Sequence, residues 1–228
     1  MLDTENVLLM NTYNYNTEKK WYDNYALCIY NLQTNKRHQI EMDFGKGILL
    51  SYFSSTVLIE NKKDKIAVAH PTLPFIYIYN NKLETIDTVY VQFQDNISVD
   101  SVINTVFSDS LLELNSNRPK EIIQIIKDGN IDQMERIEKV FWLSYDILGY
   151  TICKPLSKER MFVFYSISQK KELHRNTYYG APYNFFSSTR ILIDNNKTIW
   201  YEPIYKDDKS DMYYQFRIYD LLPFDGAK

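Results

Sequence analysis

The sequence TVLIENKKDKIAVAHPTLPFIYIYNNKLETIDTVYV, residues 56–91, decides the fold. It contains four short runs rich in β-branched and aromatic residues, at 56–60, 65–70, 75–80 and 84–91; such runs are typical of strands. The segments between them are rich in Asn, Asp, Lys and Pro, as turns are. They are too short for a crossover helix, so neighbouring strands must pair antiparallel through hairpins. This stretch therefore predicts one four-stranded meander.

The same pattern recurs along the chain, marked by a strand that ends in Tyr and a small turn-forming residue. The markers are CIYN, YIYN, VFYS and RIYD, which contain Tyr30, Tyr79, Tyr165 and Tyr219. Further strands are expected at 7–10, 25–30, 37–42, 139–145, 149–154, 161–167, 172–178, 189–194, 198–202 and 213–220, with polar connections at 14–24 and 203–211. Repeated meanders of this size predict an all-β fold, a β-propeller with about four recognisable blades in a single domain, 1–228.

The apolar spacing changes from two to about 3.6 residues after Ile97, which indicates helices. Ser98 is suited to cap the first helix, Pro119 to begin the second, and 131–140 reads as a shorter third. We therefore expect a helical insertion over residues 97–138, between the second and third recognisable blades. Local departures from a repeating pattern often mark functional sites.

The blades at the two ends look incomplete. The first lacks an opening strand and the last stops after its third strand. A closed propeller leaves no sheet edge uncovered. Three alternatives follow: the chain closes an irregular four-bladed ring, forms part of a larger six-bladed ring, or has its edges covered by a partner.

Composition limits the functional classes. The chain has 228 residues, a net charge of −3, 20 Tyr and 12 Phe. The mildly acidic balance argues against nucleic acid as a partner, and no apolar run is long enough to cross a bilayer. The first residues do not form a secretory signal. Cys28 and Cys153 lie in apolar strands, so we expect buried hydrophobic side chains, with a disulfide between them as the alternative.

The sequence KDKIAVAHPTLPFIYIYNNKLETIDTV, residues 63–89, resembles the six-bladed propeller proteins of the NHL- and TolB-like kind that are common in the Bacteroidales, and residues 65–91 match that blade pattern best. Residues 139–167 and 190–220 match the blade pattern more loosely. The resemblance implies a longer, six-bladed protein with a lipoprotein signal and a cell-envelope location, whereas a chain without a signal points to the cytoplasm. It supplies no catalytic residues.

Motifs for catalysis, metals or cofactors are absent from the sequence. His38, His70 and His174 lack metal-ligand spacing, and we expect solvent contact or hydrogen bonding for them, with His70 facing a blade loop. No GxSxG, Walker-type or GxGxxG motif occurs. A metal-dependent lactonase-like propeller is an alternative, with ligands drawn from Glu60, Asn61, Asp194 and Asn195. Asn and Asp after a strand are more often turn residues.

Two kinds of surface cluster remain. The mixed-charge segments 154–160 and 170–175 suggest solvated hairpins. The densest aromatic patch could bind a sugar or a peptide, although packing between blades is the commoner role of such residues; it comprises Tyr178, Tyr179, Tyr183, Phe185 and Phe186. Our leading hypothesis is a non-enzymatic propeller that binds a protein or peptide partner, with the helical insertion contributing surface. The hydrolase and a sugar-binding module are the alternatives.

Overall fold

The computed structural model describes residues 5–11, 14–16, 21–23, 25–42, 57–94, 134–154, 159–179, 190–194, 197–205 and 212–220. All secondary-structure elements within these ranges are β-strands, and the strands form five antiparallel sheets. No helix in these ranges is long and apolar enough to cross a membrane. Most of the predicted helical insertion lies outside the described residues.

The stretch that opened the sequence analysis forms the predicted meander. Its strands are β6 (Leu58–Lys62), β7 (Lys65–Ala69), β8 (Phe75–Asn80) and β9 (Thr85–Tyr90), paired in that order. The four-stranded prediction is confirmed, with strand ends shifted by one or two residues at three of the four runs.

The residues that follow the marker tyrosines hold the turns, as predicted. The Asn80 side-chain oxygen accepts hydrogen bonds from the amides of Lys82, at 2.8 Å, and Glu84, at 3.0 Å. Asn31 Oδ1 accepts from two amides of the next turn at 3.1 and 2.8 Å, and Ser166 Oγ accepts one at 3.1 Å. A side chain that bonds the backbone ahead of it ends the strand and fixes the turn.

The third meander also has four strands, namely β10 (Arg136–Trp142), β11 (Ile147–Cys153), β12 (Glu159–Ser166) and β13 (Lys171–Tyr179). The expected helix at 131–140 is wrong from Arg136 onward. A bulge at Glu138 interrupts the pairing of β10 with β11. The extra residue places the core residues Ile137 and Val140 three positions apart, and this spacing resembles a helix in the sequence.

The first and last sheets have three strands each, as the sequence predicted. The first contains β1 (Asn6–Asn11), β4 (Tyr25–Asn31) and β5 (Arg37–Met42); the last contains β14 (Arg190–Asp194), β15 (Lys197–Tyr205) and β16 (Met212–Asp220). The expectation of a strand-free connection at 14–24 is wrong, because β2 (Asn14–Asn16) and β3 (Trp21–Asp23) pair as a hairpin. Residues 203–205, expected in a loop, extend β15.

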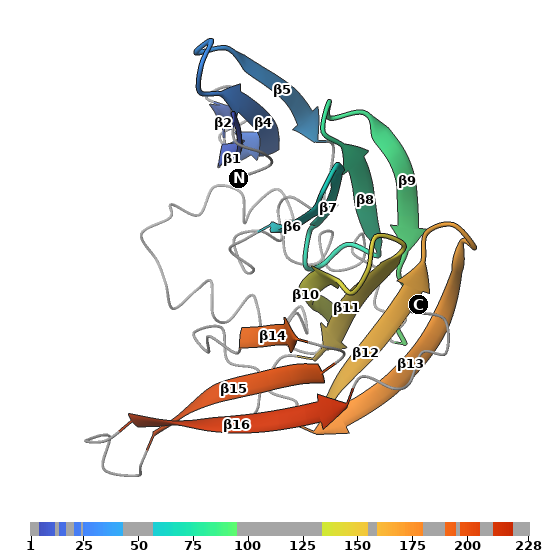
Figure 1. Ribbon diagram of the computed structural model, residues 1–228. Helices are drawn as coiled ribbons and strands as arrows, with labels where there is room; N and C mark the ends of the chain where they lie inside the picture. Colours follow the sequence, from blue (N-terminus) through green and yellow to red (C-terminus); the bar gives the residue numbers. More distant parts are fainter. Residues whose placement is uncertain are drawn as a thin grey trace, which may run out of the picture.

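The larger sheets fan around a common centre, each with its first strand innermost and its last strand on the rim (Figure 1). The main core lies between the second and third of these sheets, where Ala67, Ile76 and Val89 pack in one cluster with Leu148 and Val163. β10 contacts both β6 and β7. Separate radial sheets, packed face to face, define an all-β propeller rather than a sandwich or barrel.

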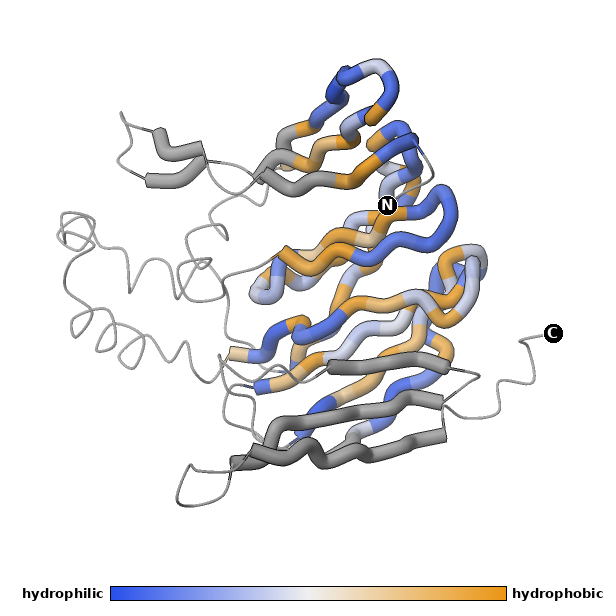
Figure 2. The backbone as a smooth tube through the Cα atoms, turned by 60° about the vertical axis from the view of Figure 1, so that its left-hand side comes forward, coloured by the Kyte–Doolittle hydropathy of each residue, from blue (hydrophilic) through white to orange (hydrophobic). Residues whose placement is uncertain are grey.

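The short turns of these blades lie at one end of the sheets. His38 Nε2 lies 3.1 Å from the carbonyl oxygen of Lys82, and this contact joins the β4–β5 turn to the β8–β9 turn. Lys65 Nζ donates to the carbonyl of Tyr145 at 3.0 Å, joining the β6–β7 and β10–β11 turns. Because a meander reverses at every turn, the strand ends that flank 12–24, 43–56, 95–133 and 155–158 lie at the opposite end. We call this the long-connection end; Figure 2 shows the polar short turns together on the right.

Gly149 makes room for an aromatic ring across the β10–β11 pair. Its register partner is Phe141, and a Cβ built on Gly149 would lie 2.1 Å from Phe141 Cε2. We expect Gly149→Ala to lower the free energy of unfolding by about 1–3 kcal/mol through overpacking, measured by urea denaturation. Adding Phe141→Leu should recover part of the loss. An unchanged urea midpoint in the single variant would contradict this packing.

Candidate functional site

The two ends of segment 95–133 meet at the long-connection end. The Gln94 amide donates a short hydrogen bond to the Glu135 carboxylate, which is buried. Met134 is buried as well, and the Ile137 amide donates to the Pro71 carbonyl at 2.7 Å. The chain therefore leaves one blade and returns to the next at adjacent points on a fixed base.

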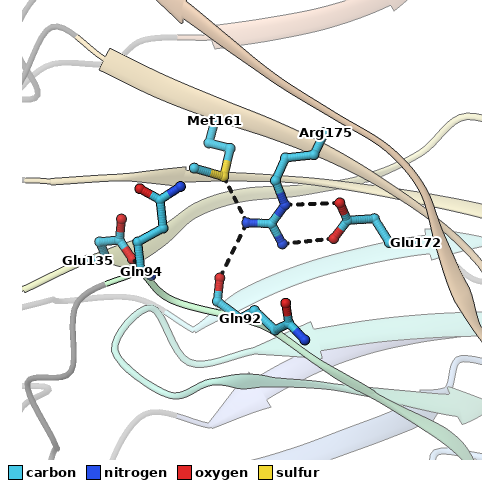
Figure 3. A network of polar contacts seen from close by, with 6 residues as sticks. All are labelled: Gln92, Gln94, Glu135, Met161, Glu172 and Arg175. Atoms are coloured by element: carbon cyan, nitrogen blue, oxygen red, sulfur yellow. Dashed lines mark hydrogen bonds and ion pairs between the residues drawn. The ribbon is translucent and has the colours of Figure 1, made fainter.

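Arg175 ties this base to the outer strand of the third sheet (Figure 3). Its guanidinium donates to both Glu172 carboxylate oxygens, at 2.9 and 2.7 Å, and to the Gln92 carbonyl at 3.4 Å. A further contact joins it to Met161 Sδ at 2.9 Å. The hydrogen bonds to Glu172 are the main cause of the raised pKa of Arg175. The guanidinium of Arg175 thus links β13 to the residues just after β9. Its two parallel hydrogen bonds to the Glu172 carboxylate fix its orientation.

The β7–β8 loop packs against the same base through His70. This side chain is fully buried, and its Nδ1 accepts from the Thr72 amide at 3.3 Å and lies 2.8 Å from Thr72 Oγ1. Because the amide donates to Nδ1, the neutral ring carries its proton on Nε2. Burial, followed by the charge of Arg136, lowers the pKa of His70 to about 4. The predicted loop location and hydrogen-bonding role are confirmed.

Arg136, Cys153 and Arg160 are register partners across β10, β11 and β12. Arg160 Nε donates to both oxygens of Glu138, at 3.1 and 2.9 Å, and its side chain is fully buried. The solvated-hairpin interpretation of 154–160 is therefore wrong at Arg160. In the sequence this arginine looks like its charged neighbours, because its partner lies on another strand and at a bulge.

The cysteines behave as buried hydrophobic residues. Cys28 and Cys153 are both buried and free, so the disulfide alternative is wrong. Burial is the main cause of the raised pKa of the Cys153 thiol, ahead of the charge of Glu138. A protonated, inaccessible thiol is a poor nucleophile.

The innermost strands carry the residues considered for a metal. Glu60 on β6 pairs with Lys139 on β10 at 3.9 Å, and the Glu60 carbonyl accepts from Trp142 Nε1 at 3.3 Å. Burial raises the pKa of Glu60 against the effect of Lys139. In the described ranges no group of three or more His, Cys, Asp or Glu side chains is placed to hold a metal ion.

The other predicted site residues are scattered or lie outside the described ranges. Asn61 is exposed on β6, whereas Asp194 ends β14 in another sheet; Asn195 is outside the described residues. His38 is exposed at the short-turn end, and His174 stacks on Phe164 with ring centroids 6.0 Å apart. Those that lie in the described part of the chain form no common metal site.

The aromatic patch is described only at its start. Tyr178 and Tyr179 are the last residues of β13, in register with Arg160 and Glu159. Tyr183, Phe185 and Phe186 lie outside the described residues. A sugar- or peptide-binding role for this patch stays a prediction.

Comparison with known proteins finds similar structures but no family. No family model and no curated protein matches this sequence. Among solved structures, the β-propeller domain of the Trilobed protease from Pyrococcus furiosus is similar, with 13% identity, a TM-score of 0.44, and coverage of 95% of this chain and 55% of that one. An acylaminoacyl peptidase from Pyrococcus horikoshii is similar at 12% identity and a TM-score of 0.47, with 94% of this chain and 29% of that one covered. The chain thus spans about half, or less, of the structures that it matches.

Proposed function

We propose that this chain is a non-enzymatic propeller module that binds a protein or peptide partner at its long-connection end, with segment 95–133 contributing surface. The clamped base of that segment carries the proposal. The hydrogen bond of Gln94 to Glu135 holds its two ends together, and Arg175 ties the residues before the segment to β13 of the next blade. A long segment on a rigid base is a common way for a scaffold to present a binding surface.

The chemistry of the buried groups near this base favours binding over catalysis. His70 is neutral and Cys153 is protonated at neutral pH, and Arg160 is bonded to Glu138. Each has a packing or pairing role inside the blades. A catalytic group needs access to substrate and a pKa suited to its reaction, and these buried groups lack that access.

The wider assembly is part of the same proposal. The first and last described sheets have three strands each, one fewer than the second and third sheets. The chain would then be a segment of a larger, six-bladed ring of the NHL- and TolB-like kind. In such a ring, neighbouring blades or a partner would cover the faces of the two end sheets.

Replacing residues 95–133 with a short Gly-Ser linker tests the proposal. We expect the variant to lose a partner that the full chain captures from a lysate of its source cells and that then binds as purified protein. The β signal in circular dichroism should remain. Leu32→Ser, at the short-turn end, is the control and should retain capture. Capture that survives the replacement would refute the proposal, and a lower Tm with unchanged capture would assign the segment a capping role only.

A further inference from the structure

The short-turn end of the blades carries an excess of positive charge. With one strand residue on each side, its described turns span residues 31–37, 62–65, 80–85, 142–147 and 166–171. These segments, which lie together in Figure 2, contain eight cations and three acidic residues, in a chain whose net charge is −3. The cations are Lys36, Arg37, Lys62, Lys63, Lys65, Lys82, Lys170 and Lys171. The positive charge of the molecule is therefore concentrated at this end.

The acidic groups at this end are engaged by neutral side chains. Asp64, Glu84 and Asp146 each accept a hydrogen bond from a side chain of the same or the adjoining turn, at 3.3, 2.7 and 2.7 Å. Glu5, which borders the β4–β5 turn, accepts from Gln33 Nε2 at 2.9 Å. Among the eight cations, in the described part of the chain, only Lys170 pairs with a carboxylate, that of Asp87 at 3.8 Å. Six of the eight are exposed, so most of this charge is available to an external anion.

Two large hydrophobic side chains are exposed among these charges. Leu32, in the β4–β5 turn, is 50% exposed, and Tyr145, in the β10–β11 turn, is 44% exposed. Lys65 Nζ lies 3.9 Å from the centroid of the Tyr145 ring, and Lys63 Nζ lies 5.7 Å from it. Tyrosine and lysine side chains together are typical of the boundary between lipid headgroups and acyl chains.

We propose that the short-turn end binds the surface of a membrane that contains anionic phospholipids. The negative potential of such a surface attracts lysines, and apolar side chains on the turns add affinity by entering the headgroup region. Seven of the eight cations are lysines, which act as point charges, whereas the arginine fork suits recognition of an individual phosphate. The cations come from turns of three sheets, an arrangement that fits an extended surface better than one peptide or nucleic-acid strand.

This binding is independent of the partner proposed for the long-connection end. The two ends are separated by the length of the strands, because a meander reverses at every turn. A chain bound through its short turns lies on the membrane and directs the long-connection end away from the lipid. The base formed by Gln94 and Glu135 therefore remains accessible.

Co-sedimentation of the full chain with vesicles tests the proposal. We expect binding at 0.1 M NaCl to vesicles of seven parts phosphatidylcholine to three parts phosphatidylserine, and little binding to phosphatidylcholine alone. Binding should be lost at 0.5 M NaCl, because salt screens the attraction. Lys36→Gln combined with Lys82→Gln should weaken binding about 25-fold, at about fivefold for each lysine. Leu32→Ser should weaken it several-fold through lost apolar contact.

The matched control is Tyr90→Glu combined with Thr177→Glu. It changes the net charge by the same two units as the lysine variant and removes a 77% exposed aromatic ring, but at the long-connection end. Binding should persist, because a strand of six or more residues is about 20 Å long, beyond the roughly 10 Å screening length at 0.1 M salt.

A fluorescent probe locates the contact. Leu32→Cys labelled with the fluorophore NBD should brighten with the phosphatidylserine vesicles as the probe leaves water, whereas the same probe at Tyr90→Cys should not. Cys28 and Cys153 are buried and give little background.

Four results would overturn the proposal. The first is a wild-type chain that does not sediment with phosphatidylserine vesicles at 0.1 M NaCl. Equal weakening by the lysine variant and its control would make net charge, rather than this end, the cause. A probe that brightens only at Tyr90→Cys would place the contact at the other end. Binding of poly(U) RNA or polyglutamate in preference to vesicles would assign the cations to a different polyanion.

Discussion

Arg160→Met is expected to lower the free energy of unfolding by about 3–5 kcal/mol, because it leaves the Glu138 carboxylate buried without its partner. The two side chains are 0% and 9% exposed, and the guanidinium donates to both carboxylate oxygens. Urea denaturation followed by circular dichroism measures the loss. Glu138→Gln should also destabilise the chain, since it leaves the charge of Arg160 uncompensated.

The double variant distinguishes loss of a partner from loss of packing. Arg160→Met combined with Glu138→Gln removes both charges, so its destabilisation should be smaller than the sum of the single effects. The matched control is Lys170→Met, which removes the ion pair of an exposed lysine with Asp87 and should change stability by no more than about 1 kcal/mol. Additive single effects, or equal losses at Arg160 and Lys170, would contradict a coupled buried pair.

The features that the sequence predicted well are local ones. Alternating apolar residues located the strands of the second and third sheets, and the residues after the marker tyrosines located the turns. Asn80, for example, bonds the next backbone amides in the way its position suggested. These signals require only neighbouring residues, because a strand alternates and a turn residue bonds its own backbone.

The features that the sequence did not predict depend on residues far apart in the chain. Gln94 and Glu135 are separated by 41 positions, and Arg175 reaches Gln92 across 83. Arg160 looked solvated because its partner Glu138 sits at a bulge, and that bulge also disguised β10 as a helix. Such contacts depend on how strands and sheets pack against one another. The alternation of apolar and polar residues along one strand does not specify that packing.

The stability of the chain should fall as the pH is lowered through the range in which His70 takes up a proton. In the folded chain the pKa of His70 is about 4, against 6.5 for an ordinary histidine. Between these values the unfolded chain binds the proton more strongly, so unfolding is favoured as the pH falls from about 6.5 to about 4. The difference between the two pKa values corresponds to a loss of about 3 kcal/mol in the free energy of unfolding at the lower end of this pH range.

Urea denaturation of the wild-type chain and of His70→Asn between pH 4 and 7.5 measures the pH-dependent contribution of His70 to stability. The Asn side-chain oxygen can accept from the Thr72 amide in place of Nδ1 but does not titrate in this range. Other groups, including Glu60, titrate in both chains, so the difference between them isolates His70. Wild type should lose stability relative to His70→Asn as the pH falls below about 6.5. A constant difference across this range would mean that His70 is equally protonated in both states, which its burial beside Arg136 opposes.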